Sequence, residues 1–375
     1  MKKTADVIII GGGVIGCAIA YFLRQKQVDV VLVERGALGG QASGAAAGLL
    51  APLGPLSGPG PFADLVLAGF SLLRALLPAL EEESGIHVGY EQAGALRTIR
   101  NPKRVAHLQK RLAQWQPLGL ELYWLDGEEA RRHEPLLASD ICGAVYAPEE
   151  SLLHAPSVVQ AFAQGAQRSG AYLYPYQEST RLLTQGTRVT GIVTAREEHV
   201  SCQHLIIASG AWAAYSAAQL QVTLPISPLQ GQILSYSKQS LPLRHIVFGE
   251  AVYVVPHANA VLVGATKDEF GFDIAVTRDG VTWLQSTAAR LLPALAEHQL
   301  QAAWAGLRPR TPDSRPILDR LVPWENVFVA TGHNSVGIIL SAITGQSMAD
   351  MITTGQVPPL VQPFSMQRFA QSEQE

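Results

Sequence analysis

The segment ADVIIIGGGVIGCAIAYFL, residues 5–23, decides the fold class of this chain. Its apolar, β-branched beginning ends in glycines, as expected of a strand that is buried on both faces. The residues from Val14 onward predict a helix with small side chains, and VDVVLVERG at 28–36 predicts a second buried strand. A strand, a helix and a strand in such quick succession are typical of the opening of a doubly wound parallel sheet.

Glycines at the end of the first strand match the pattern G-x-G-x-x-G. Gly11 permits a tight turn, Gly13 lets the backbone approach a pyrophosphate, and Gly16 lets the helix pack closely on the strand. The helix then begins with Val14 and Ile15. The N-terminal end of this helix offers free N–H groups and a partial positive charge to phosphate. We therefore predict that these five residues bind a dinucleotide.

The end of the second strand indicates which dinucleotide is bound. Glu34 follows Gly16 by 18 residues, a position that suits a ribose 2′-hydroxyl and disfavours the 2′-phosphate of NADP; we include the adjacent Arg35 in this site. Residues 36–61 carry no charge and are rich in Gly, Ala and Pro. In this segment the hydroxyl of Ser43 and several backbone amides could line a long cofactor, which favours FAD over NAD.

The rest of the chain alternates between two patterns, so we predict an α/β protein with two interleaved domains. Helices are expected at 63–83, 102–115 and 279–292, and long strands at 228–266. A Rossmann-like nucleotide-binding domain would alternate with a smaller α+β domain that has an antiparallel sheet and binds substrate. The first domain is assigned residues 1–85, 148–222 and 322–368, and the second is assigned 86–147 and 223–321.

Composition excludes several other classes. A net charge of −3 without a long basic run argues against nucleic-acid binding. Cysteines stand only at 17, 142 and 202, with no C-x-x-C spacing, so we expect no disulfide framework, no metal site and a reducing cytoplasm. The uncharged run 7–23 after Met-Lys-Lys has the outline of a signal peptide, but glycines interrupt it early, and we expect neither a leader nor a membrane anchor.

These motifs together resemble the D-amino-acid oxidase family of flavoproteins, and within it the bacterial glycine oxidases linked to thiamin thiazole synthesis. The resemblance continues in order through LIIASGAW, PLQGQILSY, YVVPHANAVLVGAT, WAGLRPRTPDSRPIL and ATGHNSVGIILSAITG. It implies non-covalent FAD, oxidation of the C–N bond of a small amino acid or amine, and return of the electrons to O₂ as H₂O₂. Oligomers are frequent in the family, so a homo-oligomer is possible for this chain.

An amino-acid oxidase must hold a carboxylate, and an arginine can grip one with two parallel hydrogen bonds. The segment WAGLRPRTPDSRP supplies Arg308, Arg310 and Arg315. From residue type alone, an ion pair with Asp313 or Asp319 is an equally good interpretation of Arg308. The resemblance assigns the carboxylate role to Arg308 and leaves the other two arginines to the turn.

Three further residues are candidates on weaker grounds. Strand alternation could place the ring of Tyr253 either in a core or over the substrate, and the resemblance implies that its phenol lines the substrate pocket. Gly210 follows a buried strand in LIIASGAW and is expected to contact the cofactor. Lys267, just after VGAT, stands where family members vary and could also touch the pocket.

The stretch GHNSVG departs from the family pattern. Glycine oxidases usually have Gly-His, an aromatic residue, Arg, Asn and Gly here, whereas this chain has Ser335 at the arginine position between Gly332 and Gly337. The missing arginine is expected to help bind the substrate carboxylate, so larger or N-substituted amino acids become plausible substrates, as do other small amines. His333 could cap the strand end or contact flavin or substrate. We expect a helix directly after this turn, from about Ile338, with its N–H groups at the N1–C2=O edge of the flavin.

The favoured hypothesis is an FAD-dependent oxidase of glycine or another small amino acid or amine. Hydride would pass from the α carbon to flavin N5, and the resulting imine would be hydrolysed to glyoxylate and ammonia or consumed in thiazole synthesis. One alternative is a dehydrogenase of the same fold that passes electrons to a quinone or carrier. Another is a flavin-binding protein without turnover, acting as an assembly partner.

Overall fold

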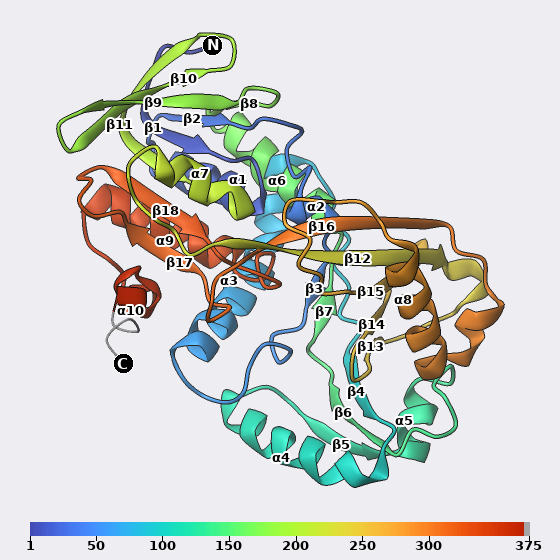
Figure 1. Ribbon diagram of the computed structural model, residues 1–375. Helices are drawn as coiled ribbons and strands as arrows, with labels where there is room; N and C mark the ends of the chain where they lie inside the picture. The colour runs from blue at the N-terminus through green and yellow to red at the C-terminus, as the bar shows by residue number, and fades with distance from the viewer. Residues whose placement is uncertain (371–375) are drawn as a thin grey trace.

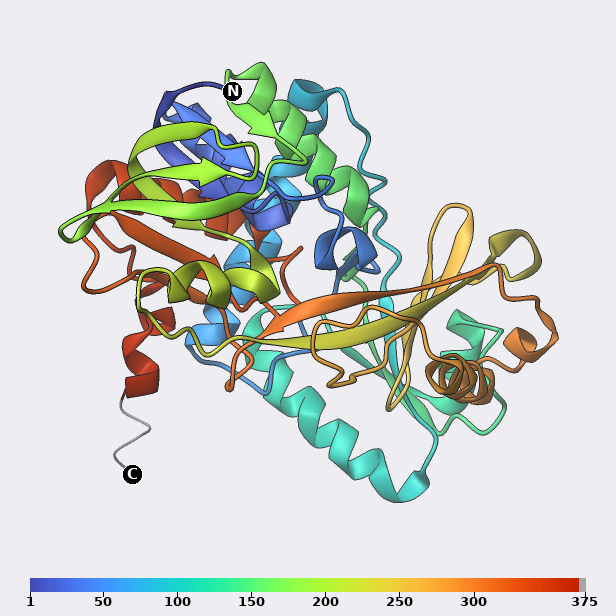
Figure 2. The same cartoon turned by 45° about the horizontal axis from the view of Figure 1, so that its top comes forward.

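Figure 1 shows a computed structural model of the chain, which describes residues 1–370. The chain forms two eight-stranded sheets, each with helices packed against it. The long strands β12 and β16 belong to the second sheet and extend toward the first sheet (Figure 2). The predicted α/β class with a second sheet-rich part is confirmed.

The first sheet has a parallel centre in the order β18-β11-β1-β2-β8. Its parallel strands are β1 (Thr4–Ile10), β2 (Val30–Val33), β8 (Tyr172–Tyr174), β11 (His199–Ile207) and β18 (Val327–Thr331). Three antiparallel strands complete it, namely β17 (Ile317–Arg320) beside β18 and the hairpin of β9 (Ser179–Gln185) and β10 (Arg188–Thr194) beside β11. Because β17 belongs to this sheet, the predicted boundary at 321/322 falls one strand too late.

Successive side chains of these strands point to opposite faces of the sheet, and both faces are apolar and buried. Helices cover one of these faces. They are α1 (Val14–Gln25), α3 (Pro61–Ser84), α6 (Ala155–Arg168) and α9 (Ser341–Thr354). Among residues 1–370, α3 is the one helix long and apolar enough to span a membrane, but here it packs on α6 and α9 as a core helix. On the opposite face, α7 (Ala213–Ala218) packs against β11.

The second sheet has the order β16-β12-β15-β14-β13-β4-β6-β5 and is antiparallel except between β13 and β4. The strands are β4 (Ala95–Ile99), β5 (Tyr123–Asp126), β6 (Gly143–Ala147), β12 (Ser227–Ser237), β13 (Ile246–Phe248), β14 (Tyr253–Pro256), β15 (Ala260–Gly264) and β16 (Ala302–Arg310). Helix α8 (Arg278–Leu291) packs on one face, over side chains such as Leu234 and Val263. The other face carries Ile233 and Leu262, which belong to one buried cluster with Ala47 and Leu152.

Short elements complete the fold. They are α2 (Ala42–Ala45), α4 (Val105–Trp115), α5 (Gly127–His133), α10 (Gln367–Ala370), the paired strands β3 (Leu49–Leu50) and β7 (Ser151–Leu152), and 3₁₀ turns at Pro102–Arg104, Gln116–Leu118, Gly210–Trp212, Lys238–Ser240, Pro293–Glu297 and Gln362–Phe364.

The helices predicted at 63–83, 102–115 and 279–292 agree with the structure within a few residues, whereas the short helices α2, α5, α7 and α10 were not predicted and one further helix was expected too early. Helix α5 was missed, although Asp126 and Glu129 form a capping box at its start. The helix expected directly after GHNSVG begins only at Ser341, because residues 334–340 form a series of turns. Within these turns the amide of Leu340 donates to the carbonyl of Val336 at 3.0 Å, and that of Val336 to the carbonyl of His333 at 3.0 Å.

Candidate cofactor and substrate site

The glycine turn after β1 leaves no room for side chains. Gly11 has φ +115°, and a Cβ built on it would lie 2.5 Å from the carbonyl oxygen of Ala208 on the neighbouring strand's end. A Cβ on Gly16 would strike the carbonyl oxygen of Gly11. The turn therefore depends on glycine at both positions, and it brings the start of α1 directly to the strand edge.

The start of α1 presents donors to a cavity. The hydroxyl of Ser43 already accepts a hydrogen bond from the amide of Val14 at 3.0 Å. Within residues 1–370, the amides of Gly13 and Ile15 have no acceptor, and both residues line the cavity. Free N–H groups at a helix N-terminus are suited to a phosphate oxygen.

The carboxylate of Glu34 is held at the end of β2. One oxygen accepts from the amide of Gly12 at 2.8 Å, and the other accepts from the amide of Gly36 at 2.9 Å. An ionised carboxylate has lone pairs for further donors, so Glu34 can also receive ribose hydroxyls. Next to it, the guanidinium of Arg35 lies 3.9 Å from the ring centroid of Trp212.

The charge-free segment 36–61 lines the cavity with most of its residues 41–49 and contacts the second sheet there. The indole of Trp304 on β16 donates to the carbonyl of Ala45 at 3.0 Å, and a Cβ on Gly306 would lie 2.6 Å from the Cβ of Ala45. The ring of His257 hydrogen-bonds to the carbonyl of Ala47 at 2.8 Å. This segment forms a wall of the cavity with backbone rather than with bulky side chains.

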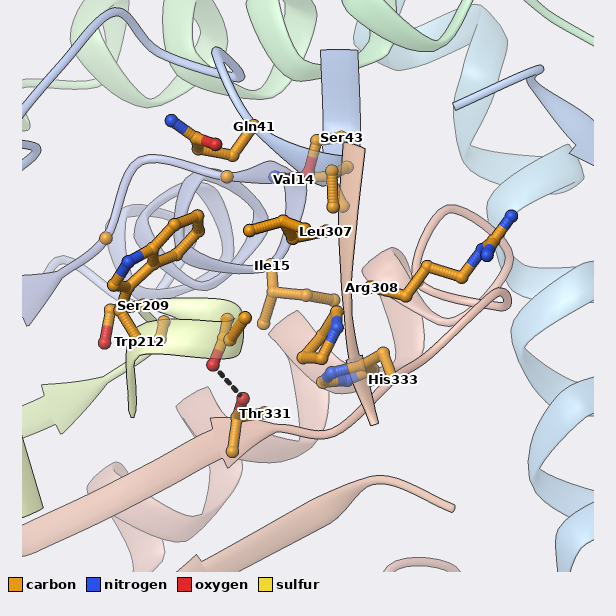
Figure 3. A pocket seen from close by; sticks show the side chains of 18 of the residues that line it. Val14, Ile15, Gln41, Ser43, Ser209, Trp212, Leu307, Arg308, Thr331 and His333 are labelled. Atoms are coloured by element: carbon orange, nitrogen blue, oxygen red, sulfur yellow. Dashed lines mark hydrogen bonds between the residues drawn. The ribbon is translucent and has the colours of Figure 1, made fainter. Parts of the chain in front are cut away.

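These elements enclose a cavity of about 770 Å³, which lies in the usual range for a ligand site. All the predicted site residues line it except Gly16 and Gly332, which serve the packing of the two turns. Figure 3 shows Trp212 and Ser209 toward one end and Arg308 at the other. Lys267 is exposed and does not line the cavity.

Arg308 projects from β16 into the cavity wall. Its Nη1 donates to the carbonyl of Thr266 at 3.1 Å and, more weakly, to that of Gln230 at 3.4 Å. Burial lowers the pKa of Arg308, while the nearby Tyr253 and Asp268 favour its charged form. Its Nη2 and Nε have no partner within residues 1–370, so the side of the guanidinium that they form remains available to a ligand.

The competing ion pairs considered for Arg308 are not formed. Asp313 pairs with Arg368 at 2.8 Å, and Arg310 pairs with Glu269 at 2.6 Å outside the cavity. Asp319 accepts hydrogen bonds from the amides of Arg320 and Met366.

Tyr253 stands on β14 opposite Gly264 of β15, and its ring covers that glycine. A Cβ on Gly264 would lie 2.5 Å from Cζ of the ring. Burial raises the pKa of Tyr253, although the charge of Arg308 opposes this shift, so the phenol stays protonated at neutral pH. Its hydroxyl has no hydrogen-bond partner within residues 1–370 and lines the cavity.

The turn after β18 forms a further part of the cavity lining. His333 is only 3% exposed, its Nε2 lies 3.1 Å from the hydroxyl of Thr344, and burial lowers its pKa to about 3, so the ring is neutral. Asn334 has φ +46°, and its amide donates to the carbonyl of Pro309 at 3.0 Å. Ser335 lines the cavity with an exposed side chain. The amides of Gly337 and Ile338, which also line it, have no acceptor within the described chain.

Several lining residues were not predicted from the sequence. Trp212 stands in the SGAW motif and carried a usable signal, because it follows a buried strand in that motif. Ser209 stands in the same motif, Gln41 and Thr331 lie in other stretches that resemble the family, and Ser179 lies in none of them. Within residues 1–370, the buried hydroxyls of Ser179 and Ser209 lack any hydrogen-bond partner, which is costly unless a ligand supplies one.

The donor set fits FAD. The glycine turn and free amides at α1 suit its pyrophosphate, Glu34 suits a ribose, and Ser179 and Ser209 line the same cavity with hydroxyls that have no partner within residues 1–370. The amides of Gly337 and Ile338, which have no acceptor within residues 1–370, line the same cavity as Arg308 and Tyr253.

Comparison with known proteins identifies the class. The family model described as "FAD dependent oxidoreductase" matches residues 6–351, and the chain belongs to this family. A glycine oxidase of Geobacillus kaustophilus is 33% identical over 98% of both chains, and the crystal structure of glycine oxidase from that organism aligns with a TM-score of 0.93 over 97% of this chain and 99% of that chain. The predicted family, the enzyme class and the FAD cofactor are thereby confirmed.

Other relatives show a wider range of names. A bifunctional protein ThiO/ThiG of Synechocystis is 32% identical over 98% of this chain and 55% of its own length. A hydrogen cyanide synthase subunit HcnC of Pseudomonas aeruginosa is 29% identical over 98% of this chain and 97% of its own. The family match and the likeness to glycine oxidases make the chain an FAD-dependent oxidoreductase of the glycine oxidase type.

Proposed function

We propose that this enzyme oxidises the C–N bond of glycine or another small amino acid and that Arg308 binds the substrate carboxylate. The supporting observation is the arrangement of the guanidinium. Two backbone carbonyls hold Nη1, and Nη2 and Nε have no partner in the part of the chain that the structure describes. An arginine keeps its proton at neutral pH even when buried, so this group remains a cation that is suited to a carboxylate.

The other cavity groups orient the substrate without adding charge. Tyr253 is a neutral phenol with a free hydroxyl, and His333 is a neutral imidazole bonded to Thr344. FAD, when bound, supplies the two-electron oxidation by accepting hydride from the α carbon and passing the electrons to O₂ as H₂O₂. Once the amine is neutral, no general base is required, so the protein contributes mainly positioning. The imine product is then hydrolysed.

The turn at 334–336 bears on substrate size. Ser335 stands where glycine oxidases usually have an arginine, which leaves Arg308 as the cation for the carboxylate in this part of the cavity. A short hydroxyl side chain also occupies less volume. We therefore propose that the enzyme accepts amino acids larger than glycine, including N-substituted ones.

A substrate panel tests this proposal. Flavin-loaded enzyme is supplied with glycine, sarcosine, D-alanine, D-proline and N-ethylglycine, and peroxide is measured. Methylamine and ethylamine, which lack the carboxylate, serve as controls. Turnover of the amino acids with little turnover of the simple amines is expected. Equal turnover of both groups would contradict a carboxylate site.

Two arginine variants locate that site. Arg308→Ala should raise KM for a carboxylate substrate by about 10- to 100-fold, because hydrogen bonds to charged groups contribute about 1.5–3 kcal/mol. Arg310→Ala is the matched control, since Arg310 is on the same strand but pairs with Glu269 outside the cavity. Both variants should keep their flavin. Unchanged kinetics in Arg308→Ala would show that another group binds the carboxylate.

A second candidate is a dehydrogenase that passes electrons to a quinone or carrier. The relative named hydrogen cyanide synthase subunit HcnC, which aligns over nearly its whole length, favours keeping this candidate. Comparing turnover with O₂ alone and with an added quinone or dye under nitrogen separates the two. Peroxide formation at a rate similar to dye reduction supports the oxidase.

A further inference from the structure

Arg308 and Gly231 occupy the same face of two paired strands. In the antiparallel register of β12 and β16, Arg308 is opposite Leu229 and Gly231 is opposite Gly306. Side chains alternate along a strand, so positions 229 and 231 face the same side as 308. Position 231 is the diagonal neighbour of 308, at a distance that a long side chain easily spans.

The guanidinium of Arg308 lies where a side chain at 231 would begin. An ideal Cβ built on Gly231 would be 2.5 Å from both Cζ and Nη1 of Arg308, well inside van der Waals contact. The guanidinium is the far end of a flexible side chain, so an added methyl group would displace it without breaking the sheet. The backbone of Gly231 has no left-handed φ that would forbid another residue. The need for glycine at this position therefore arises from Arg308.

The carbonyls that hold Nη1 are themselves fixed. Thr266 is held to β12 by its hydroxyl, which accepts from the amide of Gln232 at 3.0 Å. Gln230 and Asp268 exchange backbone hydrogen bonds of 2.9 and 3.0 Å. The acceptors could not follow a displaced guanidinium, so a shift of Arg308 would break its hydrogen bonds and misalign its free edge.

We propose that Gly231 is a positioning residue, whose lack of a side chain places the guanidinium of Arg308 for carboxylate recognition. This inference rests on the proposed role of Arg308. It concerns recognition of the carboxylate, because the group that a Cβ at 231 would meet is the guanidinium of Arg308.

The test is Gly231→Ala in the flavin-loaded enzyme, with glycolate as the probe because it resembles glycine but lacks the amine. Binding is followed by the change in flavin absorbance. The Kd for glycolate and the KM for glycine should rise by about 10- to 100-fold, while flavin affinity and the thermal midpoint stay near those of the parent. Gly54→Ala is the matched control, since a Cβ there meets only the carbonyl oxygen of Ala51, at 3.6 Å.

A double-mutant cycle separates this proposal from the proposed function. In an Arg308→Ala background, Gly231→Ala should change the glycolate Kd by less than about twofold, because the displaced group is already gone. Equal effects in both backgrounds would overturn the role of Gly231. If Arg308→Ala itself leaves glycolate binding intact, the proposed function fails, whatever Gly231 does.

Folding outcomes are also informative. If Gly231→Ala folds only when Arg308 is replaced by Ala, the steric relation between the two residues is supported. If it fails to fold in both backgrounds, position 231 is required for the sheet itself and the positioning role is wrong.

Discussion

Removing Arg97 should destabilise the enzyme strongly, and changing its partner as well should recover much of the loss. Arg97 on β4 is 7% exposed, and Glu150, between β6 and β7, is fully buried. Their two hydrogen bonds measure 2.5 and 2.8 Å, and Glu150 also accepts from the amide of Leu53 at 3.1 Å. The pair thus joins the second sheet to the segment that follows the wall of the cofactor cavity.

The magnitude follows from burial. In Arg97→Met, the carboxylate of Glu150 keeps one amide donor and loses its counter-ion, a change that costs about 3–5 kcal/mol at buried sites. Total stabilities are about 5–15 kcal/mol, so the loss is a large fraction of the whole. Adding Glu150→Gln removes the unpaired charge and keeps a carbonyl acceptor for Leu53, so the double variant should lose only about 1–2 kcal/mol relative to the parent.

The assay is denaturant unfolding of the flavin-loaded protein at a fixed excess of FAD, followed by circular dichroism, with free energies compared at equal slope. Arg188→Met is the control, because Arg188 pairs with Glu325 at 3.1 Å on the surface, where water solvates both groups. The reasoning is refuted if Arg97→Met and Arg188→Met shift the midpoint equally. It is also refuted if the double variant is less stable than Arg97→Met.

Three further predictions follow from single groups. Tyr253→Phe should raise KM for a carboxylate substrate by about 2- to 12-fold without loss of flavin, because one hydrogen bond to a free hydroxyl is removed. Burial raises the pKa of Cys17 and of Cys202 to about 12, so a disulfide reagent at pH 8 should label Cys142 in the folded protein and all three thiols after denaturation. Burial lowers the pKa of His333 from 6.5 to about 3. Between these values the unfolded chain binds the extra proton, so stability should fall as pH drops below 6.5, and His333→Gln should flatten that slope in unfolding measured across pH.

Features encoded within a short stretch could be predicted from the sequence. The parallel sheet and its glycine turn follow from an apolar β-branched run that ends in glycines, and both strand and turn lie within residues 5–16. The missed helix α5 had a local signal as well, since Asp126 and Glu129 have the spacing of a capping box.

Features that depend on pairing between distant segments could not be predicted in the same way. The helix after GHNSVG was placed too early because Ile338, Ile339 and Leu340 continue an apolar pattern. In the structure, the bond from the amide of Asn334 to Pro309 and the turns that follow delay the regular helix. Likewise, the sequence alone left open an ion pair between Arg308 and Asp313. In the structure Asp313 pairs with Arg368 instead, although the two residues are far apart in the sequence.

The hydrogen bond from the amide of Asn334 to the carbonyl of Pro309 explains why the side chains of this turn can differ without disturbing the fold. Pro309 directly follows Arg308, so its link to Asn334 ties the turn to the strand that carries the carboxylate site. Both partners are backbone groups, and Asn tolerates the left-handed conformation that position 334 requires. Ser335 lines the cavity, and its side chain is not part of this link. An arginine or a serine can therefore stand at 335 on the same backbone, which separates substrate preference from the flavin-binding framework.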